Sequence, residues 1–392
     1  MGKYNFDEII ERHDTYSYKW DLMPTKDVLP LWVADMDFKA APAIYKEVNR
    51  LAQNGVYGYG CIPENFYKAI VDFHKRHYRQ EVHKDWIIPT PAVVPALTAV
   101  LQALTQPGDE VIVQTPAYNC FFSCLNNSGV VTVENPICYQ DGEFKLDFED
   151  LEAKAKSPKA KSPKAKVLLF CNPQNPTGRL WSKEELLKVL KICKKHNLTV
   201  ISDEVHCDIK PNTSVFTAFS TLDKSFNDKV ITLRSPSKTF NIAGLKAAYI
   251  ICQNEEYRYK IDRQVNINEI CDLSPFGVAA TVAAYTECDD WMYELNDYIQ
   301  DNYRYLVEFF KTNFKDFKVA KLESTYLAWV DCSALNLTSK EITYKLLTSG
   351  KVYLNDGKMY HAPKEGFVRI NLGCPRALLN EALVRFKECF SN

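Results

Sequence analysis

Between Glu110 and Leu233, short apolar runs alternate with longer amphipathic segments, and this alternation restricts the possible folds more than any other feature of the chain. The apolar runs are residues 111–113, 130–133, 167–170, 198–201 and 230–233. Between two of them, residues 182–196 place apolar side chains at helical spacing. Apolar strands separated by amphipathic helices predict an α/β domain in which helices flank a mostly parallel central sheet.

Polar residues follow the carboxyl ends of these predicted strands. They are residues 115–118 (TPAY), 172–178 (NPQNPTG), 203–206 (DEVH) and 235–238 (SPSK). The carboxyl ends of parallel strands lie at one edge of a sheet, and open α/β sheets bind their ligands at that edge. We therefore expect these segments to converge on one site.

The flanking regions are mostly helical. Helices are expected at residues 43–54, 63–77, 93–104 and 291–313 and from Pro375 onwards, and strands at residues 86–89, 326–330 and 367–371. The helix that begins at Val93 follows a strand and a short turn, a geometry that presents free backbone N–H groups to an anion. Beyond Asn254 the pattern predicts an α+β domain that the N-terminal segment joins.

Two aspartates, Asp35 and Asp37, stand in the apolar and aromatic stretch of residues 29–38. Burying an unpaired carboxylate is costly, so we expect both to cap backbone groups or to line a polar pocket. For Asp37, an Asx turn before the helix that opens near Pro42 is an equally good explanation.

The composition excludes several classes of function. The chain has 392 residues, 46% of them hydrophobic, which is enough for a large core and two domains. A formal net charge of −1 gives no overall field that would attract nucleic acid or a membrane surface. The 13 cysteines show neither CxxC pairs nor zinc-ligand spacing, so no metal site is expected. No apolar run approaches the ~20 residues of a membrane span, and residues 1–6 do not resemble a signal peptide, so a cytoplasmic protein with reduced thiols is expected.

Lys238 directly follows a predicted strand and stands between small hydroxyl residues. A lysine attacks a carbonyl only as the free amine, and its ordinary pKa is about 10.4, so the protein must desolvate the amine or bind it covalently. The hydroxyls of Ser235, Ser237 and Thr239 are suited to holding a phosphate dianion. This combination favours a lysine-anchored cofactor that bears a phosphate, although a surface turn with a solvated lysine also explains so short a motif.

Residues 172–178 form a more specific motif. A residue before proline avoids the α region, so the two Asn-Pro pairs favour an extended turn from which Asn175 can point its amide inward. Asp203 ends an apolar strand, where an ionised carboxylate would keep a pyridine nitrogen protonated and so make the ring an electron sink. Considered alone, Asp203 is also explained as a helix N-cap.

Together these motifs resemble the fold-type I pyridoxal-phosphate enzymes of the class I/II aminotransferase superfamily, and within it the MalY/PatB-type cystathionine β-lyase branch. The resemblance covers nearly the whole chain, and residues 32–38 and 371–376 are typical of that branch. It implies a large cofactor-binding domain at residues 49–288 and a small α+β domain formed by residues 1–48 and 289–392. It also implies a homodimer that binds pyridoxal 5'-phosphate and a small amino-acid substrate, without nucleic-acid or membrane partners.

The resemblance assigns roles around the cofactor ring. Lys238 would bind the cofactor covalently and later move the Cα proton of the substrate. Asp203 would pair with the ring nitrogen, Asn175 would contact the ring oxygen, and Tyr118 would stack on the ring. His206 would assist the ring oxygen, and a histidine that only packs in the core is the alternative.

The resemblance also assigns residues to the cofactor phosphate. The backbone amides around Val93 and Val94, together with Ser235, would hold it, and Tyr59 of the partner subunit would reach it. Many relatives have an arginine where Lys246 stands, so this chain keeps the positive charge there but not the forked geometry.

The substrate would be bound by Arg369, Ala34 and Asn175, with Arg369 as a fork for the α-carboxylate. A substrate that has lost its Cα proton can eliminate a leaving group from Cβ or undergo transamination. The branch resemblance favours elimination of a thiol from cystathionine or a cysteine S-conjugate, and an aminotransferase is the alternative. A scaffold or anion-binding protein without catalysis is a third possibility, which the intact set of site residues disfavours.

Residues 154–166 lie outside the family pattern. They contain six lysines, no acidic residue and two copies of the sequence SPKAK. Because proline disrupts helices and like charges repel, we expect a solvated, extended loop. A docking site for a polyanion is the alternative.

Overall fold

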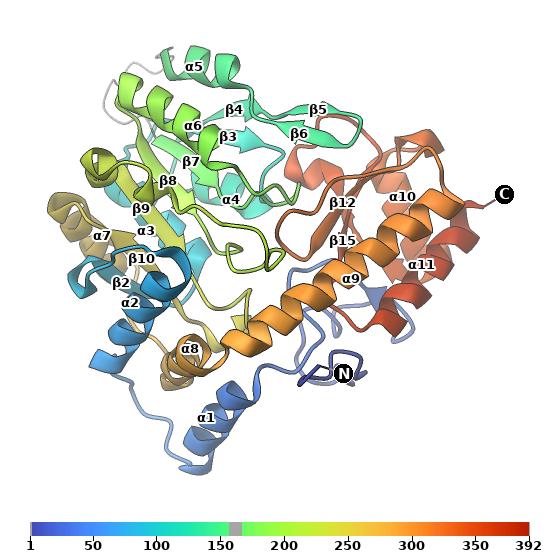
Figure 1. Ribbon diagram of the computed structural model, residues 1–392, viewed down its shortest axis with the longest axis horizontal. Coiled ribbons are helices and arrows are strands. Elements are labelled where there is room, and N and C mark those ends of the chain that lie inside the picture. The colour runs from blue at the N-terminus through green and yellow to red at the C-terminus, as the bar shows by residue number, and fades with distance from the viewer. Residues whose placement is uncertain (1, 157–166, 392) are drawn as a thin grey trace.

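The computed structural model describes residues 2–156 and 167–391, and its centre is a seven-stranded sheet (Figure 1). In spatial order the strands are β2 (Ile87–Thr90), β10 (Ala248–Cys252), β9 (Val230–Arg234), β8 (Thr199–Asp203), β7 (Val167–Cys171), β3 (Glu110–Thr115) and β4 (Val131–Pro136). The strands from β9 to β4 pair in parallel, and β10 is antiparallel to both of its neighbours. The predicted α/β class with a mostly parallel sheet is confirmed.

Helices cover both faces of this sheet because successive residues of each strand point to opposite faces. Leu168 of β7 packs on the face covered by α5 and α6, and its neighbour Leu169 packs on the opposite face, under α3, α4 and α7. The bounds of these helices are α5 (Phe148–Lys156), α6 (Lys183–His196), α3 (Val93–Leu104), α4 (Asn119–Asn127) and α7 (Glu255–Ile267). This double coverage explains why the strands are apolar throughout.

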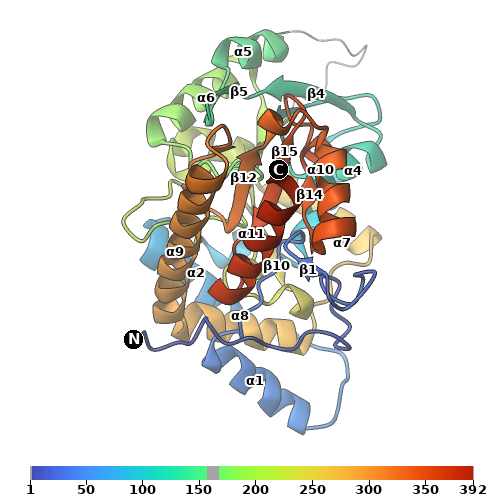
Figure 2. The same cartoon turned by 90° about the vertical axis from the view of Figure 1, so that its right-hand side faces the viewer.

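Three more helices lie at the β2 end of the sheet. They are α1 (Pro42–Gln53), α2 (Glu64–Tyr78) and α8 (Pro275–Glu287). Figure 2 shows α1 beside α8, at the end of the molecule away from α5. Among the described residues, no helix is both long and apolar enough to cross a membrane.

A second, antiparallel sheet lies beside the C-terminal helices (Figure 1). Its strands are β11 (Lys318–Val319), β12 (Leu327–Asp331), β15 (Phe367–Asn371) and β14 (Asn355–Asp356), and the helices are α9 (Asp289–Asn313), α10 (Ser339–Lys345) and α11 (Arg376–Phe390). Two small pairs complete the strands: β1 (Leu29–Pro30) with β13 (Val352–Tyr353), and β5 (Cys138–Gln140) with β6 (Glu143–Lys145). The β1–β13 pair joins the N-terminal segment to the C-terminal part of the chain.

β10 is a strand beyond those predicted from the sequence. The chain returns to the sheet soon after the loop of Lys238, without an α-helix in between. The apolar run of β10 therefore pairs antiparallel to β9. The strand expected at residues 130–133 is β4, an edge strand whose first residue, Val131, is exposed.

The lysine-rich segment was predicted wrongly at its start. Lys154 and Lys156 belong to α5, because the first proline of the segment, Pro158, comes only after them. Lys154 Nζ donates to the carbonyl oxygen of Glu134 and pairs with Asp150 at 2.8 Å. The rest of the segment lies outside the described residues.

Asp37 belongs to a buried ionic cluster, so the explanation as an Asx turn is wrong. Its carboxylate accepts hydrogen bonds from Lys19 Nζ at 2.7 Å, Arg12 Nη1 at 2.9 Å and Trp20 Nε1 at 2.8 Å. The Lys19 side chain is fully buried, and Asp35 lies 3.7 Å from its ammonium. This cluster fixes residues 35–37 beside the second sheet.

Replacing Asp37 with asparagine should lower the free energy of unfolding by about 3 kcal/mol, because it leaves the buried Lys19 ammonium without its main partner. Urea unfolding measures this change. The same replacement at Asp14, an exposed residue 2.7 Å from Lys26, is the control and should have little effect. Equal effects of the two replacements would contradict a stabilising role for the cluster.

Candidate functional site

A hollow of about 360 Å³ lies at the carboxyl ends of β7, β8 and β9, and we call it the strand-end hollow. The structure brings most of the predicted site residues to its wall: Ala34, Val93, Val94, Tyr118, Asn175, Asp203, His206, Ser235, Lys238 and Lys246. Arg369 donates a hydrogen bond to one of them, Asn175. The expected convergence of strand ends is therefore confirmed.

Lys238 stands in the loop after β9 and points its amine at backbone. Its Nζ donates a hydrogen bond to the carbonyl oxygen of Ala34 at 2.6 Å. Burial lowers the pKa of Lys238 to about 8; Arg369 adds to this shift, and the carboxylates of Asp35 and Asp203 oppose it. Roughly a tenth of the amine is therefore unprotonated at pH 7, far more than for an ordinary lysine.

Asp203 is the last residue of β8 and is buried. Its Oδ1 accepts a hydrogen bond from the N–H of Val205 at 3.1 Å. Burial raises the pKa of Asp203 to about 6, although this hydrogen bond and the charge of Lys238 oppose the shift. The carboxylate is thus largely ionised at neutral pH, and it would stabilise a cation bound in the hollow.

The opposite wall of the hollow is suited to an anion. The first turn of α3 begins at Val93, and the side chain of Ala92 does not cap its N–H groups; Val93 and Val94, in this turn, line the hollow. Lys246 also lines the hollow and contributes a positive charge; its backbone is in the left-handed region, with φ of 58°. Ser235 is less available than the sequence suggests, because its hydroxyl donates to the carbonyl oxygen of Ala247 at 2.6 Å.

Arg369, on β15, is buried against the same site. Its Nη1 donates to Asn175 Oδ1 at 3.1 Å and its Nη2 donates to the carbonyl oxygen of Trp32 at 2.8 Å. Its Nε is buried and has no hydrogen-bond partner among the described residues. Because buried N–H groups are rarely left unpaired, this atom is available to a polar or anionic ligand.

Two aromatic residues complete the wall. Tyr118 precedes α4 and packs edge-on against Phe121, and burial raises the pKa of Tyr118, so its phenol stays protonated. Burial lowers the pKa of His206 well below its usual value, so the ring is neutral. Its buried Nδ1 has no partner among the described residues.

Tyr59 is not part of the strand-end hollow of its own chain. It is fully exposed in the loop between α1 and α2. Cys171, the last residue of β7, also lines the hollow directly before the Asn-Pro motif, although it was not predicted as a site residue. Its position at a strand end was the available signal. Burial raises the pKa of the Cys171 thiol, so this side chain stays protonated and serves as a packing residue in the wall of the hollow.

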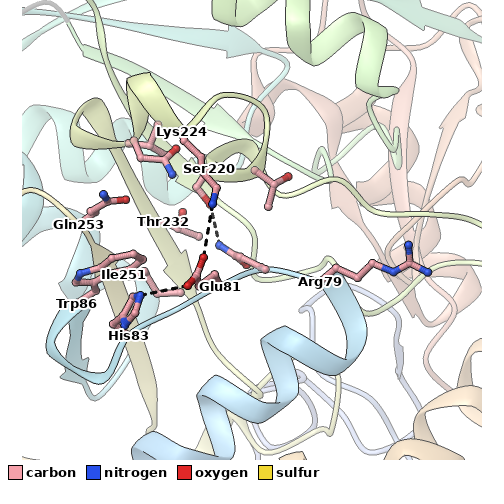
Figure 3. Close-up of a pocket in the computed structure, with 13 residues that line it drawn as sticks. Arg79, Glu81, His83, Trp86, Ser220, Lys224, Thr232, Ile251 and Gln253 are labelled. Atoms are coloured by element: carbon pink, nitrogen blue, oxygen red, sulfur yellow. Dashed lines mark hydrogen bonds and ion pairs between the residues drawn. The ribbon is translucent and has the colours of Figure 1, made fainter.

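A second hollow, of about 440 Å³, opens beside β9 and β10 and contains none of these residues (Figure 3). Some of its polar groups pair with one another: Glu81 lies 3.6 Å from Lys224 and 3.7 Å from His83, and Gln80 donates to Ser220 at 2.7 Å, whereas Asn227 Oδ1 is buried without a partner among the described residues. Figure 3 also shows Arg79 directed away from the other side chains. We therefore take the smaller strand-end hollow as the candidate active site.

Comparison with known proteins gives matches over nearly the whole chain. A family model described as aminotransferase class I and II matches residues 26–386. Cystathionine beta-lyase PatB of Bacillus subtilis (strain 168) is 38% identical over 391 residues, which cover 99% of this chain and 100% of PatB. The structure of cystalysin from Treponema denticola, which contains a pyridoxal 5'-phosphate cofactor, matches with a TM-score of 0.94 at 33% identity over 98% of each chain. The PLP-bound C–S lyase from Staphylococcus hominis matches with a TM-score of 0.91 at 30% identity, over 99% of this chain and 98% of that one.

The lowered pKa of Lys238 predicts how this amine reacts in the cofactor-free protein. Its acylation by a small reagent such as acetic anhydride should accelerate about tenfold per pH unit up to about pH 8 and then level off. Peptide mapping after pulses at each pH measures the rate. Lys84, whose pKa is raised by Glu64, is the internal control and should still accelerate above pH 10. Identical profiles for both lysines would contradict the shift.

Proposed function

This chain belongs to the class I and II aminotransferase family, and from that membership we propose that it is a pyridoxal-phosphate-dependent carbon–sulfur β-lyase. The reaction eliminates a thiol from cystathionine or a related cysteine S-conjugate and yields pyruvate and ammonia. The observation that carries the proposal is the meeting of Lys238 and Asp203 in one hollow. The identity with PatB and the likeness to two C–S lyase structures support the choice of reaction.

The residues of the hollow fit pyridoxal 5'-phosphate. The uncapped start of α3 and Lys246 would hold the phosphate, with Ser235 close by. At the other end Asp203, ionised and buried, would hold the proton on the ring nitrogen. Tyr118 would cover the ring, and Asn175 would contact its oxygen.

When bound, the cofactor supplies an electron sink for the charge that develops on the substrate Cα. Lys238 would remove the Cα proton of the substrate, which its lowered pKa permits near neutral pH. Arg369 would bind the substrate carboxylate through the Nε that now lacks a partner, with Ala34 beside it. These roles follow from the resemblance, and the geometry supports them.

An aminotransferase remains the second candidate, because the matching family takes its name from that reaction. Both reactions begin with removal of the Cα proton, and they differ in whether a leaving group departs from Cβ. The need for a 2-oxo acid as amino acceptor separates them.

We also propose a cytoplasmic homodimer in which Tyr59 of the partner subunit reaches the phosphate. The exposed apolar residues Val56, Tyr57 and Tyr59 support such a contact surface. A fully active monomer in sedimentation experiments would contradict it.

We further propose the division into a large domain at residues 49–288 and a small domain of residues 1–48 and 289–392, which the β1–β13 pairing supports.

The decisive assay supplies cystathionine without any 2-oxo acid. The protein loaded with pyridoxal phosphate should release pyruvate and a thiol, Lys238→Ala should release neither, and Lys84→Ala, the surface control, should behave like the parent. Lactate dehydrogenase coupling measures pyruvate. Turnover only after a 2-oxo acid is added would establish the aminotransferase, and equal turnover by Lys238→Ala would remove the assigned role of this lysine.

A further inference from the structure

Residues 32–36 pass the strand-end hollow without belonging to a strand, and side chains from distant parts of the chain hold their peptide carbonyls. Arg369 and Asn355 donate to Trp32, Asn371 to Val33, Lys238 and Tyr326 to Ala34, Asn371 and Lys19 to Asp35, and Arg12 and Asn241 to Met36. The position of this segment is therefore set by side chains.

Ala34 is the residue of this segment whose carbonyl contacts the reactive amine. The oxygen accepts Lys238 Nζ at 2.6 Å and the Tyr326 hydroxyl at 2.9 Å. A carbonyl oxygen has two lone pairs, so these donors satisfy it fully. Tyr326 is completely buried, and its ring lies edge-on to His206 with 6.0 Å between ring centroids.

We propose that Tyr326 is a positioning residue for Lys238: its hydroxyl fixes the Ala34 carbonyl, which receives the lysine amine whenever that amine is not covalently engaged. The inference rests on the proposed function, in which Lys238 must leave its covalent partner during turnover and then act on the Cα proton. Tyr326 does not line the hollow, and its hydroxyl is linked to Lys238 through the Ala34 carbonyl oxygen that both groups share.

The arrangement has a consequence for the charge of Lys238. A fixed carbonyl acceptor stabilises the protonated amine and so offsets part of the effect of burial. Without the tyrosine hydroxyl the peptide can turn away, and the protonated amine loses that acceptor.

Tyr326→Phe removes only the hydroxyl and tests the proposal. The acylation profile of Lys238 in the cofactor-free protein should shift to lower pH by about 0.5 to 1 unit. In the loaded enzyme kcat should fall about tenfold while KM changes less than about twofold, because the amine is misplaced for proton transfer and substrate binding is untouched. Incorporation of 4-aminophenylalanine at position 326 keeps an N–H donor and should restore both values.

Tyr303→Phe is the matched control, because the Tyr303 hydroxyl also donates to a backbone carbonyl, that of Ala320, at 3.1 Å. It should change neither the profile nor kcat. An unchanged Lys238 profile in Tyr326→Phe, or the same shift in Tyr303→Phe, would overturn the proposal whatever the activity. The acylation experiment needs no turnover, so it separates this proposal from the proposed function, which fails if the parent enzyme forms no pyruvate.

Discussion

The parallel pairing of β7, β8 and β9 is the constraint on which the site depends. In this register Cys171 lies beside Asp203, and Asp203 lies beside Leu233, so the three strands end together. The chain then leaves each strand at the same edge, with the Asn-Pro motif, Asp203 and the Lys238 loop as neighbours. A shift of one residue in any of the three strands would turn its side chains to the opposite face and break up the site.

Burial acts in opposite directions on the two principal ionisable groups. It lowers the pKa of Lys238 to about 8 and raises that of Asp203 to about 6. Between these values the carboxylate is charged while part of the lysine is neutral, which suits a bound cation beside a proton acceptor. The charge of each group also reduces the pKa shift of the other, so the two pKa values depend on each other.

Much of the fold and most of the site were predictable because both depend on local patterns. Apolar runs identified the parallel strands, and polar residues just beyond them identified Asp203, Asn175 and Lys238. The ionic cluster of Asp37 and Lys19 was not predictable, since its partners are separated along the chain by loops without a periodic pattern. The same holds for Tyr326, whose hydroxyl reaches a carbonyl almost 300 residues away in sequence. Tyr59 cannot be assigned from one chain, because its proposed role needs a second copy.

The strand ends assemble a site around Lys238, and we propose that pyridoxal phosphate binds there through this amine. Borohydride reduction of the protein loaded with pyridoxal phosphate, followed by proteolysis and mass spectrometry, tests it most directly. We expect the reduced cofactor to be attached to Lys238 and the yellow absorbance to disappear as the label forms. A label spread over surface lysines such as Lys84, or located on Lys246, would contradict it.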